Sequence, residues 1–565
     1  MPVRGFRALV AIGVSAATIA MSAAPALAAD ESDKPDKPVN PTSVAIILPV
    51  TIPLTTDSFV SQGATHFGTF FSAETLERYT APGSPLALEL DAVIDRGATI
   101  AIDPLVVASI RRLGSTAPPS AVDWLTRLDA ATNDTFTLGF ADSDVTAPLQ
   151  AGREEVLRTG SLDYAIDPSV FAGVPTETPD PDATADPETQ LPPLPTSADL
   201  TAWDSTLPSV SWPVADTVIG SDLAAIEDSG YATTILSSKN VSRTSRANAS
   251  ATIAGYPVLV TDETISSLLD STIGAETESS WESSMDALGA AITSYSERGL
   301  GTTLALSIDR TQEVPTQWLT RTIDAVDALT EANLVPLHTI ASTTPTKAKV
   351  IDKPQSTTRI DRVADLLASQ ALDRQFARIA ETPQLITGER RARLLVTLSP
   401  AASQRPGGWG ASTDEFLRES SDLRASVQLV PSGDILALAD RSRLPIYVDN
   451  ALNQEVTVYV TVSPSLPLVA VDDDRVKFTI KAQSLDKVEI PVQSLSNGDV
   501  DLRVSLHTDT DLRVRVGEAN QLSMNVRAGW EGPVTIAIGI VVVAFFIFGL
   551  VRTIIRRRVA LRSER

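Results

Sequence analysis

Val44-Ala45-Ile46-Ile47-Leu48-Pro49-Val50 is the stretch that decides the fold of this chain. It is an apolar run without a charged residue, and the apolar character continues to Leu54. An amphipathic strand alternates apolar and polar residues, whereas a continuous apolar run is typical of a strand that is covered on both faces. Helices on both faces of a parallel sheet provide that cover, so the run predicts the first strand of an α/β domain.

Strand and helix patterns alternate from this run as far as His338. Ser72 is a plausible N-cap of the first helix, with Glu74 near its positive end. Later strands are predicted at 98–102, 135–140, 210–213, 232–236, 257–260, 303–308 and 334–338, and later helices at 104–113, 222–228, 263–269, 281–298 and 316–332. This alternation indicates a mainly parallel sheet, and the number of units favours an irregular (β/α) barrel over residues 42–340.

Two segments depart from this alternation. Residues 175–196 are rich in proline and acidic residues and contain few large apolar side chains, so we predict a disordered loop within the barrel-like domain. Residues 341–426 are predicted to be a linker and a helical segment, since apolar residues recur at helical spacing between 360 and 380.

The period of the apolar pattern changes to two within residues 427–527. Short runs alternate apolar and polar residues, as in Val456, Val458, Val460 and Val462. Asn497-Gly498 between two such runs is a strong signal for a tight turn. Regular short alternating strands predict an all-β sandwich of immunoglobulin-like type.

The two ends of the chain carry export and membrane signals. Residues 1–28 have a basic start, an apolar stretch and the Ala26-Leu27-Ala28 signature, so a signal peptide cleaved after Ala28 is predicted, followed by a disordered lead-in at 29–41. Residues 533–555 are long and apolar enough for a transmembrane helix. The arginine-rich tail at 556–565 indicates the cytoplasmic side. We therefore expect a single-pass cell-membrane protein with an extracytoplasmic body.

Charge and composition exclude several classes of function. The chain has 46 basic and 70 acidic residues, and eight of the basic residues lie in the signal peptide and in the tail from Arg552 onward. The body is therefore strongly acidic and should repel nucleic acid, although it could attract cations or a basic partner. The chain has no cysteine, which excludes disulfides, thiol catalysis and cysteine-ligated metals.

Cofactor motifs are absent from the sequence. His66, His338 and His507 are the only histidines, and no paired-histidine zinc motif occurs. A zinc-dependent polysaccharide deacetylase is therefore disfavoured. The sequence also lacks a G-x-S-x-G nucleophile motif, a phosphate-binding loop and a dinucleotide fingerprint, so we predict no cofactor and no metal.

Acidic residues recur where predicted strands end, the edge at which α/β folds build their sites. Paired carboxylates at this edge could hydrolyse a glycosidic bond. A competing interpretation is structural, because an Asp that precedes a helix caps it, as in Ile102-Asp103-Pro104. Asp142-Ser143-Asp144 could hold a hard cation, or could be a solvated turn. The candidates are Asp103, Asp142, Asp144, Asp262 and Asp309, and Asp216 has a similar position.

Two tryptophans are candidates for stacking on a sugar ring. Trp212 precedes Pro213 at a predicted strand end, and Trp409 lies in a glycine-rich loop at 407–410. Tryptophan is more often a core residue, so the alternative for both is packing.

The layout of the chain resembles an uncharacterised actinobacterial family of secreted or single-pass membrane proteins, often encoded beside the lipid II flippase of the MurJ type. The resemblance spans nearly the whole chain. It rests on Ile46 to Pro49, Ile102-Asp103-Pro104, Phe140 to Asp144, Ser211-Trp212-Pro213, Leu394 to Ser399, Leu444 to Asn450 and Trp530. The family has no established activity, so the resemblance implies a role in the cell envelope and assigns no catalytic residue.

Three hypotheses about function follow. The first is a non-enzymatic envelope protein that binds a cell-wall glycan or an envelope protein, because no complete catalytic constellation is present. The second is a carbohydrate-active hydrolase that uses two strand-end carboxylates. The third is an accessory partner of a membrane transporter or flippase.

Overall fold

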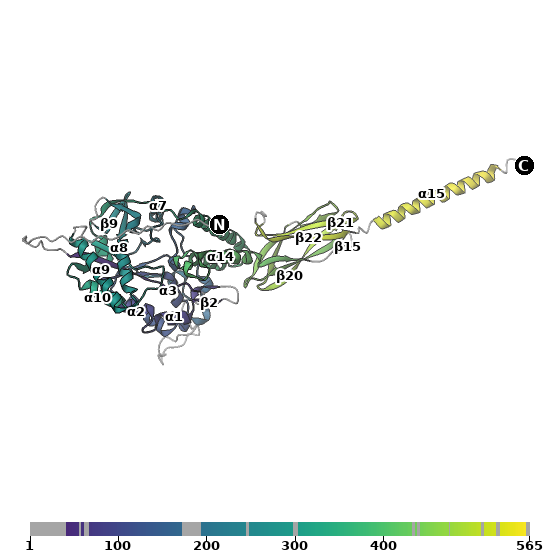
Figure 1. Ribbon diagram of the computed structural model, residues 1–565. Helices are drawn as coiled ribbons and strands as arrows, with labels where there is room; N and C mark the ends of the chain where they lie inside the picture. Colours follow the sequence, from purple (N-terminus) through teal and green to yellow (C-terminus); the bar gives the residue numbers. More distant parts are fainter. Residues whose placement is uncertain are drawn as a thin grey trace, which may run out of the picture. The chain divides into compact units, whose positions relative to one another are not determined.

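The computed structural model describes residues 41–55, 58–61, 67–171, 194–243, 248–297, 303–431, 435–437, 441–473, 475–509, 514–526 and 531–560 (Figure 1). Several predictions lie outside these residues. They are the signal peptide with its cleavage after Ala28, the lead-in before residue 41, nearly all of the loop at 175–196, His66, Trp530 and the end of the basic tail.

The first described region is a mixed α/β domain, as the sequence predicts. Its strand β1 (Thr42–Val50) pairs in parallel with β11 (Thr303–Ser307) along one edge. Along its other edge it pairs in parallel with β4 (Thr99–Ile102) and β12 (Ala332–Leu334). Residues 44–50 are buried, so the apolar run is covered on both faces.

Seven strands, with β1 among them, form a parallel array. Their order is β6 (Val210–Ser211), β7 (Thr233–Ser237), β10 (Tyr256–Thr261), β11, β1, β4 and β5 (Thr135–Thr137). The backbone N–H of Leu207 donates to the carbonyl of Thr135 at 2.9 Å. The segment that leads into β6 therefore contacts β5, although these two strands stand at opposite ends of the array.

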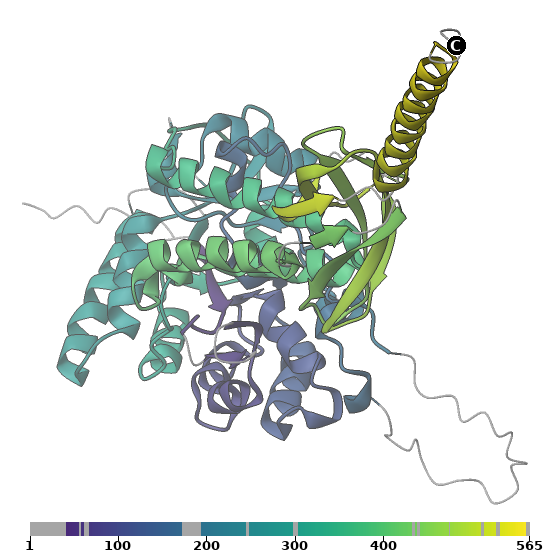
Figure 2. The same cartoon turned by 90° about the vertical axis from the view of Figure 1, so that its right-hand side faces the viewer.

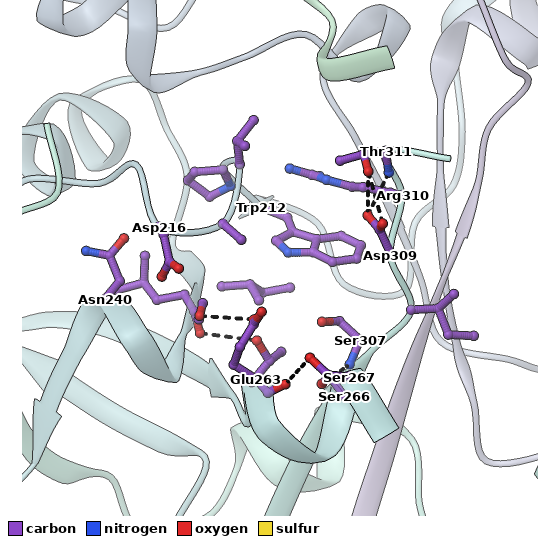
Figure 3. Close-up of a pocket in the computed structure, with 18 of the residues that line it drawn as sticks. Trp212, Asp216, Asn240, Glu263, Ser266, Ser267, Ser307, Asp309, Arg310 and Thr311 are labelled. Carbon is purple, nitrogen blue, oxygen red and sulfur yellow. Dashed lines mark hydrogen bonds between the residues drawn. The ribbon is translucent and has the colours of Figure 1, made fainter. Parts of the chain in front are cut away.

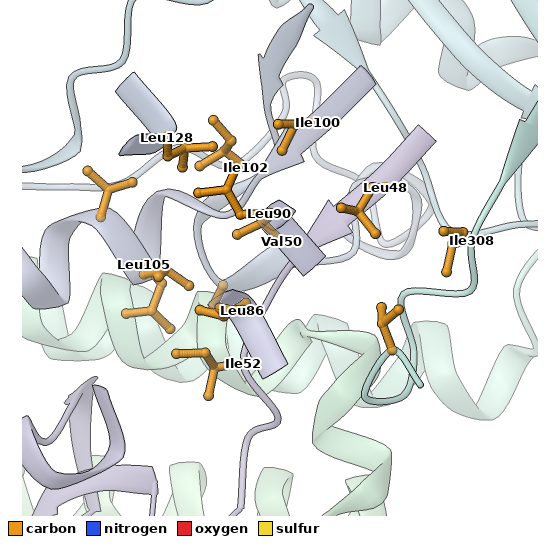
Figure 4. Packing of buried hydrophobic residues seen from close by; sticks show 14 of the residues in the cluster. Leu48, Val50, Ile52, Leu86, Leu90, Ile100, Ile102, Leu105, Leu128 and Ile308 are labelled. Carbon is orange, nitrogen blue, oxygen red and sulfur yellow. The ribbon is translucent and has the colours of Figure 1, made fainter. Parts of the chain in front are cut away.

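Helices follow the strands and bury their apolar sides against them (Figure 4). Asp103 and Pro104 explain the start of α3, because the Asp103 carboxylate accepts from Leu105 N at 2.8 Å and Pro104 occupies the first turn. The described helices up to residue 341 are α1 (Ala73–Thr80), α2 (Pro85–Val93), α3 (Pro104–Arg111), α4 (Pro119–Asp129), α5 (Thr146–Gln150), α6 (Ser197–Thr201), α7 (Gly220–Asp228), α8 (Glu263–Ile273), α9 (Glu278–Glu297), α10 (Leu319–Asp327) and α11 (Leu337–Ala341).

The region around residues 334–350 differs from the prediction. The strand expected at 334–338 ends at Leu334, and His338 lies in α11, because Pro336 has no N–H for a strand ladder and stands just before that helix. Part of the expected linker is a strand, β13 (Thr346–Val350), which pairs with β8 (Val241–Arg243) and β9 (Ser250–Ile253). A further small sheet pairs β2 (Phe59–Ser61) with β3 (Phe67–Phe71).

The segment predicted as a linker and helical segment contains three helices of the α/β domain: α12 (Thr357–Phe376), α13 (Pro383–Leu398) and α14 (Gly408–Ala425). The helical spacing at 360–380 falls mostly in α12. The apolar side chains of the three helices belong to the same core as β1. A buried ionic network also joins them, since Arg390 contacts Asp373 at 3.2 Å and Glu419 at 3.1 Å. Trp409, predicted in a loop, lies in the first turn of α14.

Residues 427–526 form two β-sheets that share one hydrophobic core. One sheet has the order β14 (Val427–Val430), β16 (Arg441–Asn450), β20 (Ser484–Ser494), β18 (Val469–Val471), and the other has β15 (Ile435–Ala437), β22 (Arg515–Val526), β21 (Gly498–His507), β17 (Val456–Pro464), β19 (Val476–Ile480). The predicted alternation holds in β17, whose four valines are buried. Strand β22 continues across Gly517, which has a φ of +65°, and its pairing with β21 contains a register shift.

The last element is α15 (Glu531–Ala560), the yellow helix of Figure 2. Residues Val534–Arg558 have a mean hydropathy of 3.0 over their most apolar stretch, and none of that stretch is buried in the protein. Among the residues that the structure describes, one helix is therefore long and apolar enough to cross a membrane.

Candidate functional site

A cavity of about 380 Å³ lies beyond the carboxyl ends of β6, β7, β10 and β11 (Figure 3). Because parallel strands end at the same edge, the residues that follow them come together although they are far apart in sequence. The polar and aromatic residues of its lining are Trp212, Asp216, Ser237, Asn240, Thr261, Glu263, Ser266, Ser267, Asp270, Ser307, Asp309, Arg310 and Thr311.

Trp212 follows β6 and lies in the wall of the cavity. Its ring packs edge-on against Phe136 at 6.2 Å between centroids. The guanidinium of Arg310 lies 4.4 Å from the centroid of the same ring. These two contacts fix the plane of the indole, and the half-buried ring remains part of the cavity surface.

Arg310 connects the cavity to the ends of β4 and β5. Its Nη1 lies 3.0 Å from an oxygen of Asp142, and both side chains are buried. This contact has the distance of an ion pair but lacks hydrogen-bond geometry, since Nη1 has no hydrogen-bond partner. Burial raises the pKa of Asp142 to about 6, although Arg310 opposes that increase.

Asp103 lies buried behind this ion pair. Its carboxylate accepts from the backbone N–H groups of Leu105 and Ala141, each at 2.8 Å. Ala141 and Asp142 have left-handed φ values of 60° and 47°, so Asp103 holds a strained turn in place as well as capping α3. Burial raises the pKa of Asp103 to about 8, which keeps this carboxyl largely protonated at neutral pH.

Asp144 points to a different set of partners from Asp142. It accepts from Gln355 Nε2 at 3.0 Å and from Arg359 Nη2 at 3.1 Å, and it also accepts from the backbone of Thr146 and Ala147. The two acids of the D-x-D pair therefore do not converge. Within the described ranges, no group of three or more His, Asp or Glu side chains has an arrangement that could hold a metal ion.

The carboxylates of the cavity have fewer buried contacts. Asp309 is exposed and accepts from the backbone N–H and hydroxyl of Thr311 at 2.9 Å. Asp270 accepts from the backbone N–H of Asp309 at 3.0 Å, and burial raises its pKa to about 6. Glu263 pairs with Lys239 at 3.1 Å and accepts from Ser237 at 3.3 Å.

Asp216 is unusual among the acids of the cavity. It has a left-handed φ of 58°, and its Oδ1 is buried without a hydrogen-bond partner. Asp262, in contrast, caps α8 through Thr264 N and Ile265 N at 3.1 Å and lines a separate cavity of about 580 Å³ beside Arg243. The structure thus brings Asp216 and Asp309 to one cavity and places Asp262 elsewhere.

Trp409 does not reach this cavity. Arg359 lies 4.3 Å from its ring centroid, and its Nε1 donates to the carbonyl of Thr397 at 3.0 Å. Glu263 and Asp270 do line the cavity, yet sequence reasoning did not select them. One signal could have found them, because they stand seven residues apart in α8 and therefore on one face of that helix.

A comparison with models of protein families finds a match over most of the chain. The family of unknown function DUF6049 matches residues 31–560. No curated protein matches the chain.

Solved structures give only weak similarity. The α-amylase AmyC from Thermotoga maritima aligns with 10% identity and a TM-score of 0.41 over 68% of this chain and 93% of that one. A GH57 branching enzyme from Thermococcus kodakaraensis aligns with 10% identity and a TM-score of 0.37 over 68% and 90%. Salmonella alpha-2-macroglobulin aligns with 18% identity and a TM-score of 0.15 over 18% of this chain, which spans 7% of that protein. These TM-scores are too low to carry an argument.

Proposed function

Since the chain belongs to the DUF6049 family, which has no assigned function, we propose from the cavity itself that the protein binds a glycan at the carboxyl ends of β6, β7, β10 and β11. The observation that carries this proposal is a tryptophan ring in the wall of a cavity that also presents hydroxyls, carboxylates and an amide, beside apolar residues and Arg310. A sugar offers the matching surfaces, because its ring faces are apolar and its rim consists of hydroxyl groups.

The hydrogen bonds and ion pairs that the buried acids already make favour binding over catalysis. Asp103 and Asp142 hold a strained turn and a buried arginine, and Asp144 holds Gln355 and Arg359. Side chains with these structural tasks are poorly placed to exchange protons with a substrate. In this proposal the parallel array is a degenerate (β/α) barrel that keeps the binding edge of the fold, and residues 427–527 form an immunoglobulin-like sandwich.

The location we propose is the cell envelope. The signal peptide predicted at 1–28 and the acidic body agree with export, and the arginines that follow the apolar helix agree with a cytoplasmic C-terminus. The glycan would then be a component of the cell wall, in line with the resemblance to an actinobacterial envelope family. A membrane partner such as a MurJ-type flippase is a further proposal, which co-purification before and after exchange of α15 would test.

Binding is tested with the full-length protein in detergent and a panel of cell-wall oligosaccharides. Trp212→Ala should weaken glycan binding at least about tenfold, because it removes the only aromatic ring of the described lining. Trp318→Ala is the matched control, since Trp318 stacks on Trp281 and donates to Ala275 O outside the cavity. Equal loss in both variants, or no binding by the wild-type protein, would contradict the proposal.

A second candidate function is hydrolysis of the bound glycan. Asp270 favours it, because its raised pKa of about 6 suits a general acid, and Asp216 and Asp309 are further carboxylates in the lining of the same cavity. Prolonged incubation with the same oligosaccharides, followed by mass spectrometry of the products, separates the two functions. Cleavage that is lost in Asp270→Asn would establish the hydrolase, and intact ligand with retained binding would exclude it for that panel.

A further inference from the structure

The charges that line the glycan cavity are strongly unequal. Among the described lining residues, four are carboxylates, namely Asp216, Glu263, Asp270 and Asp309, whereas Arg310 is the only cation. Arg310 does not neutralise these four, because its partner at 3.0 Å is Asp142 behind the cavity wall. A ligand that enters therefore meets an excess of negative charge in a partly enclosed space, where screening by solvent is reduced.

One of the four carboxylates has its own counter-charge. Lys239 lies 3.1 Å from Glu263. Asp216, Asp270 and Asp309 have no basic partner among the described ion pairs, and Asp270 is in its charged form above pH 6 or so. Three carboxylates thus remain available to interact with a positive charge on the ligand.

A bare metal ion does not fit this arrangement. Chelation needs several oxygen ligands within one small sphere, and in the part of the chain that the structure describes, no three acidic or histidine side chains meet that condition. The positive charge is therefore expected on a larger molecule, which its other contacts with the cavity can hold in position.

Arg310 and Trp212 indicate which other chemical groups the ligand should have. The Arg310 side chain is only 6% exposed and lines the cavity. Its Nη1 is occupied by the contact with Asp142 at 3.0 Å, whereas its Nε and Nη2 have no hydrogen-bond partner among the described residues. A buried guanidinium N–H without an acceptor favours a ligand that brings one, such as a hydroxyl or ring oxygen. The indole beside it favours a flat apolar face. These two observations are independent of the carboxylates and also indicate a sugar.

We propose that the cavity selects an amino sugar whose amine is free and protonated, over the same sugar in its N-acetylated form. The inference rests on the proposed glycan binding and adds the chemical class of the ligand. The ammonium group would lie beside Asp270 and Asp309, which are joined by a hydrogen bond of 3.0 Å, and Asp216 would add negative charge from another part of the lining. Arg310 would donate to a sugar oxygen, and Trp212 would pack on the ring. An N-acetyl group would remove the positive charge and leave these carboxylates without a partner.

The test compares two ligands that differ only at the amine, the hexasaccharide of glucosamine and the hexasaccharide of N-acetylglucosamine. Calorimetric titration of the full-length protein in detergent should show at least about tenfold tighter binding of the glucosamine oligomer. High salt should reduce that preference, because screening weakens charge complementarity.

The variant Asp216→Asn/Asp270→Asn/Asp309→Asn should abolish the preference while preserving the shapes of the three side chains. Asn can still accept the backbone N–H groups of Asp309 and Thr311, and it tolerates the left-handed conformation at 216. Asp228→Asn is the matched control, since Asp228 is an exposed residue of α7 outside the cavity. If the triple variant does not fold, the salt dependence of the wild-type preference still decides the question.

The possible outcomes separate this inference from the function on which it rests. Equal binding of the two hexasaccharides, or tighter binding of the acetylated one, would overturn the charge selection and leave glycan binding in place. A preference that persists in the triple variant would also overturn it. Absence of binding by both hexasaccharides and by the whole oligosaccharide panel would overturn both proposals.

Discussion

The strand-end acids fall into two groups that differ in what surrounds them. At the ends of β4 and β5, Asp103, Asp142 and Asp144 are buried and each is held by a polar partner from another segment. At the ends of β6, β7, β10 and β11, most of the acids face a cavity. We call the first group the closed side and the second the open side.

The difference comes from what packs over each strand end. On the closed side, α5 and α12 lie against each other, and Gln355 and Arg359 reach Asp144 from the start of α12. On the open side, the loops after the strands leave a space of about 380 Å³. An acid at a strand end is therefore a structural residue where a later segment covers it, and is accessible to a ligand where none does.

The largest effect is expected from Arg310→Met, which removes the ion pair between the two sides. Asp142 would keep a buried carboxylate without its positive partner, and loss of one member of a buried pair costs about 3–5 kcal/mol. Urea denaturation of the full-length protein measures the loss. The double variant Arg310→Met/Asp142→Asn should recover much of the lost free energy of unfolding. A loss below about 1 kcal/mol in the single variant would contradict a stabilising role of this ion pair on the closed side.

Asp103→Ala should have the next largest effect. It leaves the backbone N–H groups of Leu105 and Ala141 buried without an acceptor and removes the cap of α3, so a loss of about 2–3 kcal/mol is expected. Asp103→Asn is the control, because its amide oxygen can accept both bonds, and its cost should be smaller. Similar stability of the two variants in urea denaturation would show that these hydrogen bonds do not stabilise the turn.

The raised pKa of Asp103 predicts a dependence of stability on pH. Between the ordinary value of 3.8 and the folded value of about 8, the folded protein holds this proton more tightly than the unfolded chain does. The stabilising effect of the proton is present below pH 4 or so and is lost as the pH rises towards 8. Wild type should therefore lose at least about 1 kcal/mol relative to Asp103→Asn between pH 5 and 9, from the value of 1.4 kcal/mol per pKa unit.

Urea denaturation of both proteins across that range measures the difference. Parallel stability curves would show that Asp103 is already charged in the folded protein at neutral pH. The comparison with Asp103→Asn also removes the contribution of Asp142, whose pKa is raised as well.

The fold was largely predictable where local patterns decide it. The continuous apolar run at 44–50 predicted a strand covered on both faces, and Asp103-Pro104 predicted the start of α3. The valines of β17 predicted a strand with one buried face. In each case the burial pattern of a single element follows from side chains within a few residues of one another.

The rest depended on contacts between distant segments. Nothing near Lys347 and Lys349 distinguishes a strand with one exposed face from a linker, because β13 is defined by its pairing with β8 and β9. Asp142 and Asp309 look alike in sequence, yet one is buried against Arg310 and the other is exposed. Whether a later helix covers a strand end is a property of tertiary packing, which these local patterns do not encode.

The smallest effect is expected from Asp216→Gly, on the open side. The Asp216 carboxylate makes no hydrogen bond in the described structure, and its φ of 58° is a conformation that glycine adopts without strain. Relief of that strain and the greater freedom of glycine in the unfolded chain oppose each other, so the free energy of unfolding should change by less than about 1 kcal/mol. Asp216→Val should cost more, because a branched side chain disfavours left-handed backbone. If urea denaturation shows that Asp216→Gly loses as much stability as Asp103→Ala, Asp216 is a structural residue and the distinction between the two sides fails.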